Sequence, residues 1–129
     1  MNDSDLISLL STSFTKQLMW YRELSDLVHK TLGQLVLSRG DVTQVMENFT
    51  RKQKILDMIV EERDHISGSV DLWQKCKKGI KDGQASDELD DLLKKTAAVI
   101  SEFLDGEAQL KRYLEHVKNP KGGRGDTKP

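Results

Sequence analysis

The chain has 129 residues, of which 32% are charged and 5% are aromatic, and its formal net charge is −1. This composition suits long amphipathic helices better than a sheet, and it lacks the basic excess of proteins that bind nucleic acid through its phosphates. The single cysteine, Cys76, excludes an intrachain disulfide and is typical of a reduced intracellular protein.

The N-terminus shows no positively charged signal sequence, because Asp3 and Asp5 precede its first apolar residues. No apolar stretch approaches the roughly 18 to 20 residues that a membrane span needs. We therefore expect one cytoplasmic domain with no cofactor, no nucleic acid partner and no membrane span.

The first segment, residues 4–38, is predicted to form a long helix. Apolar residues recur every seven positions in two series that start at Ile7 and Leu10, and Gln17 and Thr31 interrupt the second series. Further leucines flank both series and widen the apolar face, which favours a helix packed in a bundle over a narrow two-stranded coiled coil.

A second helix is predicted over residues 42–66. Its two heptad series consist of Val42, Phe49 and Leu56 and of Val45, Ile59 and Ile66. Lys52 interrupts the second series, and we expect its stem to lie along the apolar face while its amine reaches water.

The tripeptide Arg39-Gly40-Asp41 lies between these two helices, and we interpret it as a helical corner rather than an adhesion motif. Gly40 suits the left-handed conformation that commonly closes a helix. Asp41 is a favoured N-cap residue, and Gln44 stands where the second residue of a capping box belongs. A second copy of the tripeptide, residues 124–126, lies in a tail over residues 118–129 that we expect to be disordered, since it has almost no apolar residue.

Residues 68–85 are ambiguous, because glycines and polar residues are frequent there. They form either a loop or a short fourth helix over residues 70–78, capped by Ser69. A third long helix is predicted over residues 87–117, with Ser86 as its N-cap. Gly106 falls on the apolar face of this helix, where a glycine costs about 1 kcal/mol relative to alanine.

These segments predict an all-α protein, an elongated antiparallel bundle of three long helices with coiled-coil-like packing and the optional short fourth helix. Trp20 and Met19 allow two interpretations. They are either an exposed anchor for a partner or, as we favour, they pack beneath the crossing segment around Trp73.

Catalytic and metal sites find little support in the sequence. Glu62 and His65 have the spacing of one metal-binding E-x-x-H motif, but a di-iron bundle needs two copies and further carboxylates. Cys76 has basic neighbours, yet no histidine lies near it in sequence to act as a base. We therefore expect no enzymatic activity and keep a metal-binding bundle only as a third hypothesis.

Residues 35–66, LVLSRGDVTQVMENFTRKQKILDMIVEERDHI, resemble the central hairpin of the FlgN-like family, chaperones of flagellar type III export. The resemblance depends on a leucine-rich helix, a Gly-Asp corner and a lysine followed by two apolar residues. In this sequence the matching residues are Leu32, Leu35, Gly40, Asp41, Val45, Lys54, Ile55, Leu56, Ile59 and Arg63.

The resemblance implies a chaperone that binds the amphipathic C-terminal helices of hook-filament junction proteins, with the export apparatus as a further expected partner. The implied binding region lies toward the C-terminus, and we expect helix-against-helix contacts there. The candidate partner-binding residues are Phe103, Leu110, Tyr113, Leu114 and Val117, with Tyr113 preferred. The alternative is a structural or adaptor bundle that acts through self-association, and the sequence leaves monomer and homodimer both open.

Overall fold

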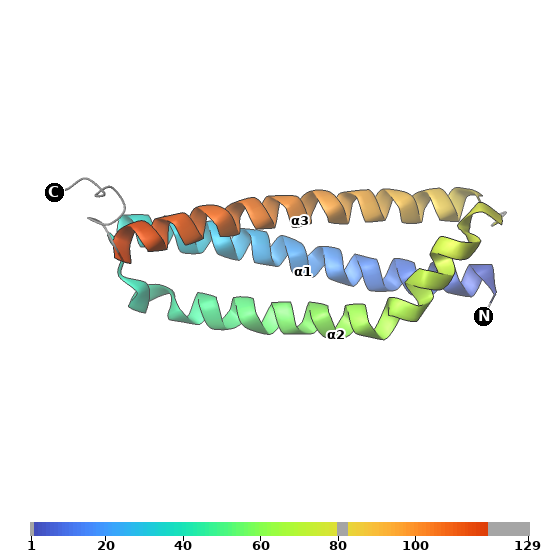
Figure 1. Ribbon diagram of the computed structural model, residues 1–129, viewed down its shortest axis with the longest axis horizontal. Helices are drawn as coiled ribbons and strands as arrows, with labels where there is room; N and C mark the ends of the chain where they lie inside the picture. Colours follow the sequence, from blue (N-terminus) through green and yellow to red (C-terminus); the bar gives the residue numbers. More distant parts are fainter. Residues whose placement is uncertain (1, 80–82, 119–129) are drawn as a thin grey trace.

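The computed structural model describes residues 2–79 and 83–118, and within these ranges the protein is entirely helical. Three long helices are present: α1 over Asp3–Leu37, α2 over Met46–Cys76 and α3 over Gly83–Lys118. Two short 3-10 helices, η1 over Val42–Val45 and η2 over Lys77–Gly79, stand before and after α2. The predicted all-α bundle of three long helices is confirmed, with α2 running opposite to α1 and α3 (Figure 1).

The sequence prediction for α1 is accurate to one residue at each end. Asn2 is the N-cap, and its side-chain oxygen accepts a hydrogen bond of 2.7 Å from the backbone N–H of Asp5. Asp3 and Asp5 place negative charge in the first turn, where the helix dipole favours it. The helix ends at Leu37, one residue before the predicted end.

The corner after α1 is a Schellman motif in which Arg39, rather than Gly40, takes the left-handed C′ position. Arg39 has φ 58° and Gly40 has φ 92°. The backbone N–H of Gly40 donates to the carbonyl of Leu35 at 2.8 Å, and that of Arg39 donates to the carbonyl of Val36 at 3.3 Å. The prediction of a glycine-assisted corner is confirmed, but the residue at C′ is an arginine, which pays a steric cost there that glycine does not.

Asp41 is an N-cap as predicted, although it caps η1 and not α2 directly. Its carboxylate accepts hydrogen bonds from the backbone N–H of Thr43 at 3.0 Å and from the Thr43 hydroxyl at 2.5 Å, and these bonds lower the pKa of Asp41. The backbone N–H of Asp41 donates to the Ser38 hydroxyl at 3.2 Å. Ser38 therefore accepts the hydrogen bond that a capping box would direct to the side chain of Gln44.

Replacing Arg39 by glycine is therefore expected to raise the free energy of unfolding by about 1 kcal/mol, because glycine adopts the left-handed conformation without the Cβ clash. Chemical denaturation of the two proteins checks this. Gly40→Ala is expected to act in the opposite direction, since a Cβ at this position would lie 2.6 Å from Cγ1 of Val117. An Arg39→Gly variant less stable than the wild type would contradict the assigned corner.

The segment that the sequence left ambiguous continues α2 without interruption to Cys76, so the separate short helix over residues 70–78 is wrong. Ser69 lies inside α2 and caps nothing. Gly68 is exposed and a Cβ there would meet open space, so the helix tolerates it. Ile66 and Trp73 are both buried and stand seven residues apart on one face, and the burial of this face outweighs the polar and glycine content of the segment.

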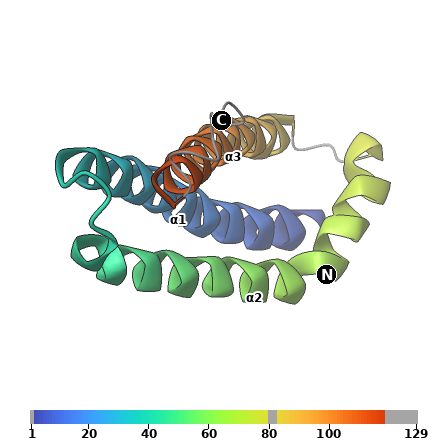
Figure 2. The ribbon, with the colours of Figure 1, turned by 60° about the vertical axis from the view of Figure 1, so that its left-hand side comes forward.

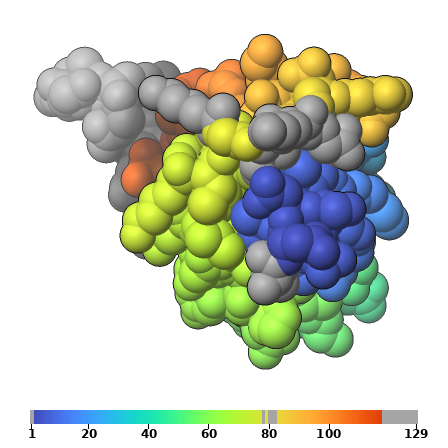
Figure 3. Space-filling model, turned by 90° about the vertical axis from the view of Figure 1, so that its right-hand side faces the viewer, coloured from blue at the N-terminus to red at the C-terminus, as the bar shows by residue number. Residues whose placement is uncertain are grey.

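The C-terminal part of α2 bends away from its first part and crosses the N-terminal end of α1 toward α3 (Figures 1 and 2). Figure 3 shows this end of the bundle, with the yellow-green turns of α2 beside the blue turns of α1. The third helix begins at Gly83, before the predicted N-cap Ser86, which lies within α3. The predicted disordered tail falls on residues 119–129, outside the described residues, apart from Lys118, which is the last residue of α3.

The core consists of two clusters, both centred on α1, which packs against α2 and α3 while α2 and α3 approach each other much less closely. The central cluster spans most of the bundle and the second lies beneath the crossing part of α2. The buried members of the central cluster are Tyr21, Leu24, Val28, Leu35, Val45, Ile55, Ile59, Phe103 and Leu110. Those of the second are Leu6, Ile7, Leu10, Ile66, Trp73 and Leu89.

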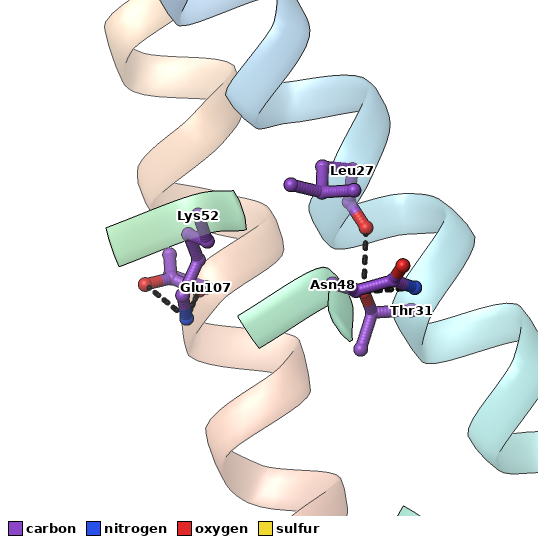
Figure 4. A network of polar contacts seen from close by, with 5 residues as sticks. All are labelled: Leu27, Thr31, Asn48, Lys52 and Glu107. Atoms are coloured by element: carbon purple, nitrogen blue, oxygen red, sulfur yellow. Dashed lines mark hydrogen bonds and ion pairs between the residues drawn. The ribbon is translucent and has the colours of Figure 1, made fainter. Parts of the chain in front are cut away.

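Polar side chains in the core set the relative positions of the helices. Asn48 of α2 donates to the Thr31 hydroxyl of α1 at 3.1 Å (Figure 4). It also donates to the Gln34 side-chain oxygen of α1 at 2.8 Å. The Ser25 hydroxyl of α1 donates to Glu102 of α3 at 3.1 Å. A shift of one helix along another would leave these partly buried groups without partners, which penalises alternative registers.

A further polar contact joins α1 to α2 through Glu62. The buried Ser13 hydroxyl donates to Glu62 Oε2 at 2.5 Å, and Lys16 Nζ lies 3.3 Å from Oε1. The Ser13 hydrogen bond is the main cause that lowers the pKa of Glu62, and Lys16 adds to it while burial opposes both.

Because the folded protein lowers the pKa of Glu62, the ionised form stabilises the fold at pH values above the ordinary glutamate pKa, and this stabilisation is lost as the pH falls through the lowered pKa. Ser13→Ala is expected to raise the pKa of Glu62 and to destabilise the protein at pH 7 by about 1 kcal/mol. The stability difference between wild type and variant should shrink on acidification. NMR titration of the Glu62 carboxyl group, with denaturation at neutral and acidic pH, checks this.

Lys16→Gln serves as the comparison, because Lys16 is nearly half exposed to water and its hydrogen bond lowers the pKa of Glu62 less than the Ser13 hydrogen bond does. Lys16→Gln should raise the pKa of Glu62 by less than Ser13→Ala does. A Ser13→Ala variant with an unchanged Glu62 pKa would show that the hydroxyl does not bind this carboxylate in solution.

Candidate functional site: a groove between α2 and α3

A surface groove of about 470 Å³ lies where α2 and α3 diverge, near the corner end of the bundle. It exists because α1 separates the two helices, so their facing sides are only partly covered. The groove is lined by Phe49, Lys52, Glu107, Ala108, Leu110, Lys111, Leu114 and Glu115. Half of the lining residues are charged, but most of the exposed lining surface is apolar, a mixture that protein-protein interfaces also show.

Exposed apolar side chains extend the groove toward the middle of the bundle. Leu104 is 57% exposed and precedes Ala108 by four residues, so it lies one turn away on the same side of α3. Val60 is 58% exposed and follows Phe49 by eleven residues, about three turns of α2. The exposed apolar surface between α2 and α3 is therefore longer than the groove itself and has the elongated shape that suits a helix.

The charged groups of the groove include an ion pair between the two helices. Lys52 Nζ of α2 lies 2.9 Å from Oε1 and 3.1 Å from Oε2 of Glu107 on α3. Figure 4 shows the two side chains meeting from opposite helices. The Lys52 ammonium also lies 5.6 Å from the centroid of the Phe49 ring. Lys52 thus interrupts the heptad series as predicted, but its amine binds Glu107 instead of simply reaching water.

The structure separates the five predicted partner-binding residues into core and surface. Phe103 and Leu110 are 4% and 2% exposed and belong to the central core cluster. The Tyr113 hydroxyl donates to the carbonyl of Leu35 at 3.1 Å, so Tyr113 fastens α3 to the C-terminal end of α1. In this conformation these three residues stabilise the fold, and they are not free to anchor a partner.

Val117 and Leu114 complete the five. Val117 packs against the corner, with its methyl groups at the position that a Cβ on Gly40 would occupy. Leu114 is half-buried and lines the groove, so it is the predicted residue best placed to contact a partner. The predicted set mixed core and surface because both kinds of apolar residue recur with the helical period.

Phe49, Lys52 and Ala108 also line the groove, and none of them was among the predicted partner-binding residues. Phe49 was assigned to the core face, and Ala108 lies outside the apolar series of α3. The lysine within the second heptad series was the sequence signal that could have indicated this surface. Lys52 marks the position where the core face of α2 meets Glu107 of α3.

Met19 and Trp20 do not pack beneath the crossing segment as we favoured. Met19 is 64% exposed, and Trp20 is half-buried against the central cluster with Lys16 Nζ 5.9 Å from its ring centroid. Trp73 is 1% exposed and lies in the other cluster, and no hydrogen-bond partner is present for its indole N–H within the described residues.

The residues considered for catalysis are not gathered into a site. Glu62 is engaged by Ser13 and Lys16, while His65 is exposed and Cys76 is half-buried at the end of α2. Within residues 2–79 and 83–118, no three His, Cys, Asp or Glu side chains lie close enough to hold a metal ion. Over the same part of the chain, no helix combines the length and apolarity that crossing a membrane requires.

The surface between α2 and α3 thus combines exposed apolar groups, an open groove and an ion pair that joins the two helices. Comparison of the chain with protein-family models, with curated protein sequences and with solved structures gave no match.

Proposed function

We propose that this protein is a non-enzymatic cytoplasmic chaperone of FlgN-like type, which binds the amphipathic C-terminal helices of flagellar hook-filament junction proteins and keeps them soluble for type III secretion. The observation that carries the proposal is the apolar groove between α2 and α3. A client helix laid in this groove would cover Phe49 and Leu114 and would become the fourth helix of the bundle.

The groove suits this role better than Phe103, Leu110 and Tyr113, which stabilise the packing of α3. A chaperone must release its client, so binding should not require the core to open. Leu114 and Ala108 are accessible from outside while Phe103 and Leu110 stay in the core. Leu104 and Val60 lengthen the apolar surface, so a client helix of several turns can bury one face along it.

The test is calorimetric titration of the full chain with synthetic C-terminal peptides of the hook-filament junction proteins from its own host. Binding at micromolar or lower Kd to at least one of them is the expected result. No binding by any of these peptides to folded protein would overturn the proposal.

The alternative is a structural or adaptor bundle that acts through self-association and buries exposed apolar surface against a second copy of the chain. It is favoured by the large exposed apolar side chains outside the groove, above all Leu37, which is 86% exposed. This alternative predicts a dimer by analytical ultracentrifugation and a melting temperature that rises with protein concentration, together with no affinity for the junction-protein peptides.

A further inference from the structure

The Lys52–Glu107 ion pair lies across the groove that the proposed function assigns to a client helix. Both residues line the groove, and their side chains are 20% and 30% exposed. The other ion pairs within the described residues, Lys16–Glu62 and Arg51–Glu23, join α1 to α2. Among the ion pairs of the described residues, Lys52–Glu107 is therefore the one that joins α2 to α3.

A helix that enters the groove must come close to both charges. The Lys52 ammonium lies 5.6 Å from the centroid of the Phe49 ring, and the other groove residues are the apolar Ala108, Leu110 and Leu114 and the charged Lys111 and Glu115. A helix that covers the groove removes water from the two charges. Each charge then depends more strongly on the protein groups that still bind it, so this pairing affects the stability of the complex more. An apolar client would leave Lys52 and Glu107 paired only with each other in a drier environment, and a client charge of one sign alone would attract one of the two and repel the other.

The ion pair itself is weak enough to be exchanged. A partly exposed lysine–carboxylate pair contributes little net stability, because water competes for both groups and two flexible side chains must be ordered. A client that offers an acid to Lys52 and a base to Glu107 can replace the internal contact without a large loss. Both groups of the pair then remain satisfied on a drier surface.

We propose that the Lys52–Glu107 ion pair selects which amphipathic helices the groove accepts. The favoured helix carries one carboxylate and one basic group at the edge of its apolar face. Their order along the helix places the carboxylate against Lys52 and the basic group against Glu107. Since the two charges lie 2.9 Å apart, the client's acid and base must come from neighbouring turns, at i and i+3 or i+4. This inference rests on the proposed function, because it names the chemistry of the client.

The test uses two synthetic amphipathic peptides of about 20 residues with leucines at i, i+3, i+4 and i+7. The peptides differ only in the order of one Glu and one Lys that flank the leucine stripe four residues apart. Each is titrated calorimetrically into the wild type and into Lys52→Glu/Glu107→Lys, which keeps an internal ion pair of reversed polarity. The wild type is expected to bind one peptide about tenfold more tightly, and the reversed variant the other by a similar factor.

A third protein, Lys52→Met/Glu107→Met, removes both charges and keeps side chains of similar length. It is expected to bind both peptides with equal affinity and to melt cooperatively. If the wild type binds both peptides equally, or if the reversed variant keeps the wild-type preference, the selection by this ion pair is overturned while the groove remains a helix-binding site. If neither peptide binds any of the three folded proteins, the groove does not accept these helices and the selection is overturned, whereas the proposed function is decided separately by the junction-protein peptides.

Discussion

Gly106→Leu is expected to lower the free energy of unfolding by about 3 kcal/mol, near the upper end of typical overpacking penalties. Gly106 is buried where α3 passes α1, and a Cβ there would already lie 3.0 Å from Val28 Cγ1 and 3.3 Å from His29 Cε1. Four added carbon atoms cannot fit between the two helices, so they must move apart and lose packing along the central cluster. Thermal and chemical denaturation, followed by circular dichroism, measures the effect.

Gly33→Leu is the matched control for this prediction. Gly33 also lies within a long helix, but it is exposed and a Cβ there meets no atom within 4 Å. Leucine at Gly33 should therefore stabilise the protein by up to about 1 kcal/mol through helix propensity alone. Equal effects of the two substitutions would show that α1 and α3 do not approach each other as closely at Gly106 as the structure places them.

Ala108→Arg is expected to weaken binding of a client peptide by about 100-fold, or 2.7 kcal/mol, while leaving the fold intact. Ala108 is exposed at the groove, so the substitution adds a long charged side chain without disturbing the core. The guanidinium would have to be covered by the client's apolar face without a partner, which is costly. The measurement is calorimetric titration with the peptide that binds the wild type most tightly.

Ala98→Arg controls for the added charge and length. Ala98 is exposed on the same helix, ten residues before Ala108, and does not line the groove. This variant should bind the peptide as the wild type does, and both variants should show unchanged helicity and melting temperature. Wild-type affinity in Ala108→Arg would place the client elsewhere on the surface, and an equal loss in both variants would point to a general charge effect.

Long periodic segments made the helices predictable, whereas their ends depended on local chemistry. The heptad series of α1 and its flanking polar residues located that helix to within one residue at each end. The end of α2 was mispredicted because Ser67, Gly68 and Ser69 resemble a loop. Gly68 faces open space, so it costs only its modest helix propensity, and burial of Trp73 keeps the helix intact beyond it. Packing across helices overrode the local signal, and that packing is not visible in the local sequence.

The candidate site was less predictable than the fold, since core and partner anchors follow the same period. Leu110 and Leu114 are separated by one turn of α3 and both line the groove, yet Leu110 is 2% exposed within the central cluster whereas Leu114 is half-buried and accessible. Tyr113, the preferred contact, instead donates its hydroxyl to the Leu35 carbonyl near the end of α1. Which of these residues remains accessible depends on the angle at which α2 and α3 diverge from α1.

Apolar periodicity and capping chemistry act over a few neighbouring residues, so the sequence pattern predicts the all-α class, the three long helices and the corner at Arg39–Asp41. Contacts across the bundle place α1 between α2 and α3, bring α1 and α3 close together at Gly106, and bring Lys52 to Glu107 across a groove. These features depend on contacts between residues far apart in the chain. A heptad pattern shows that a face must be buried, but the relative positions of the packed helices decide how much of that face remains open to a partner.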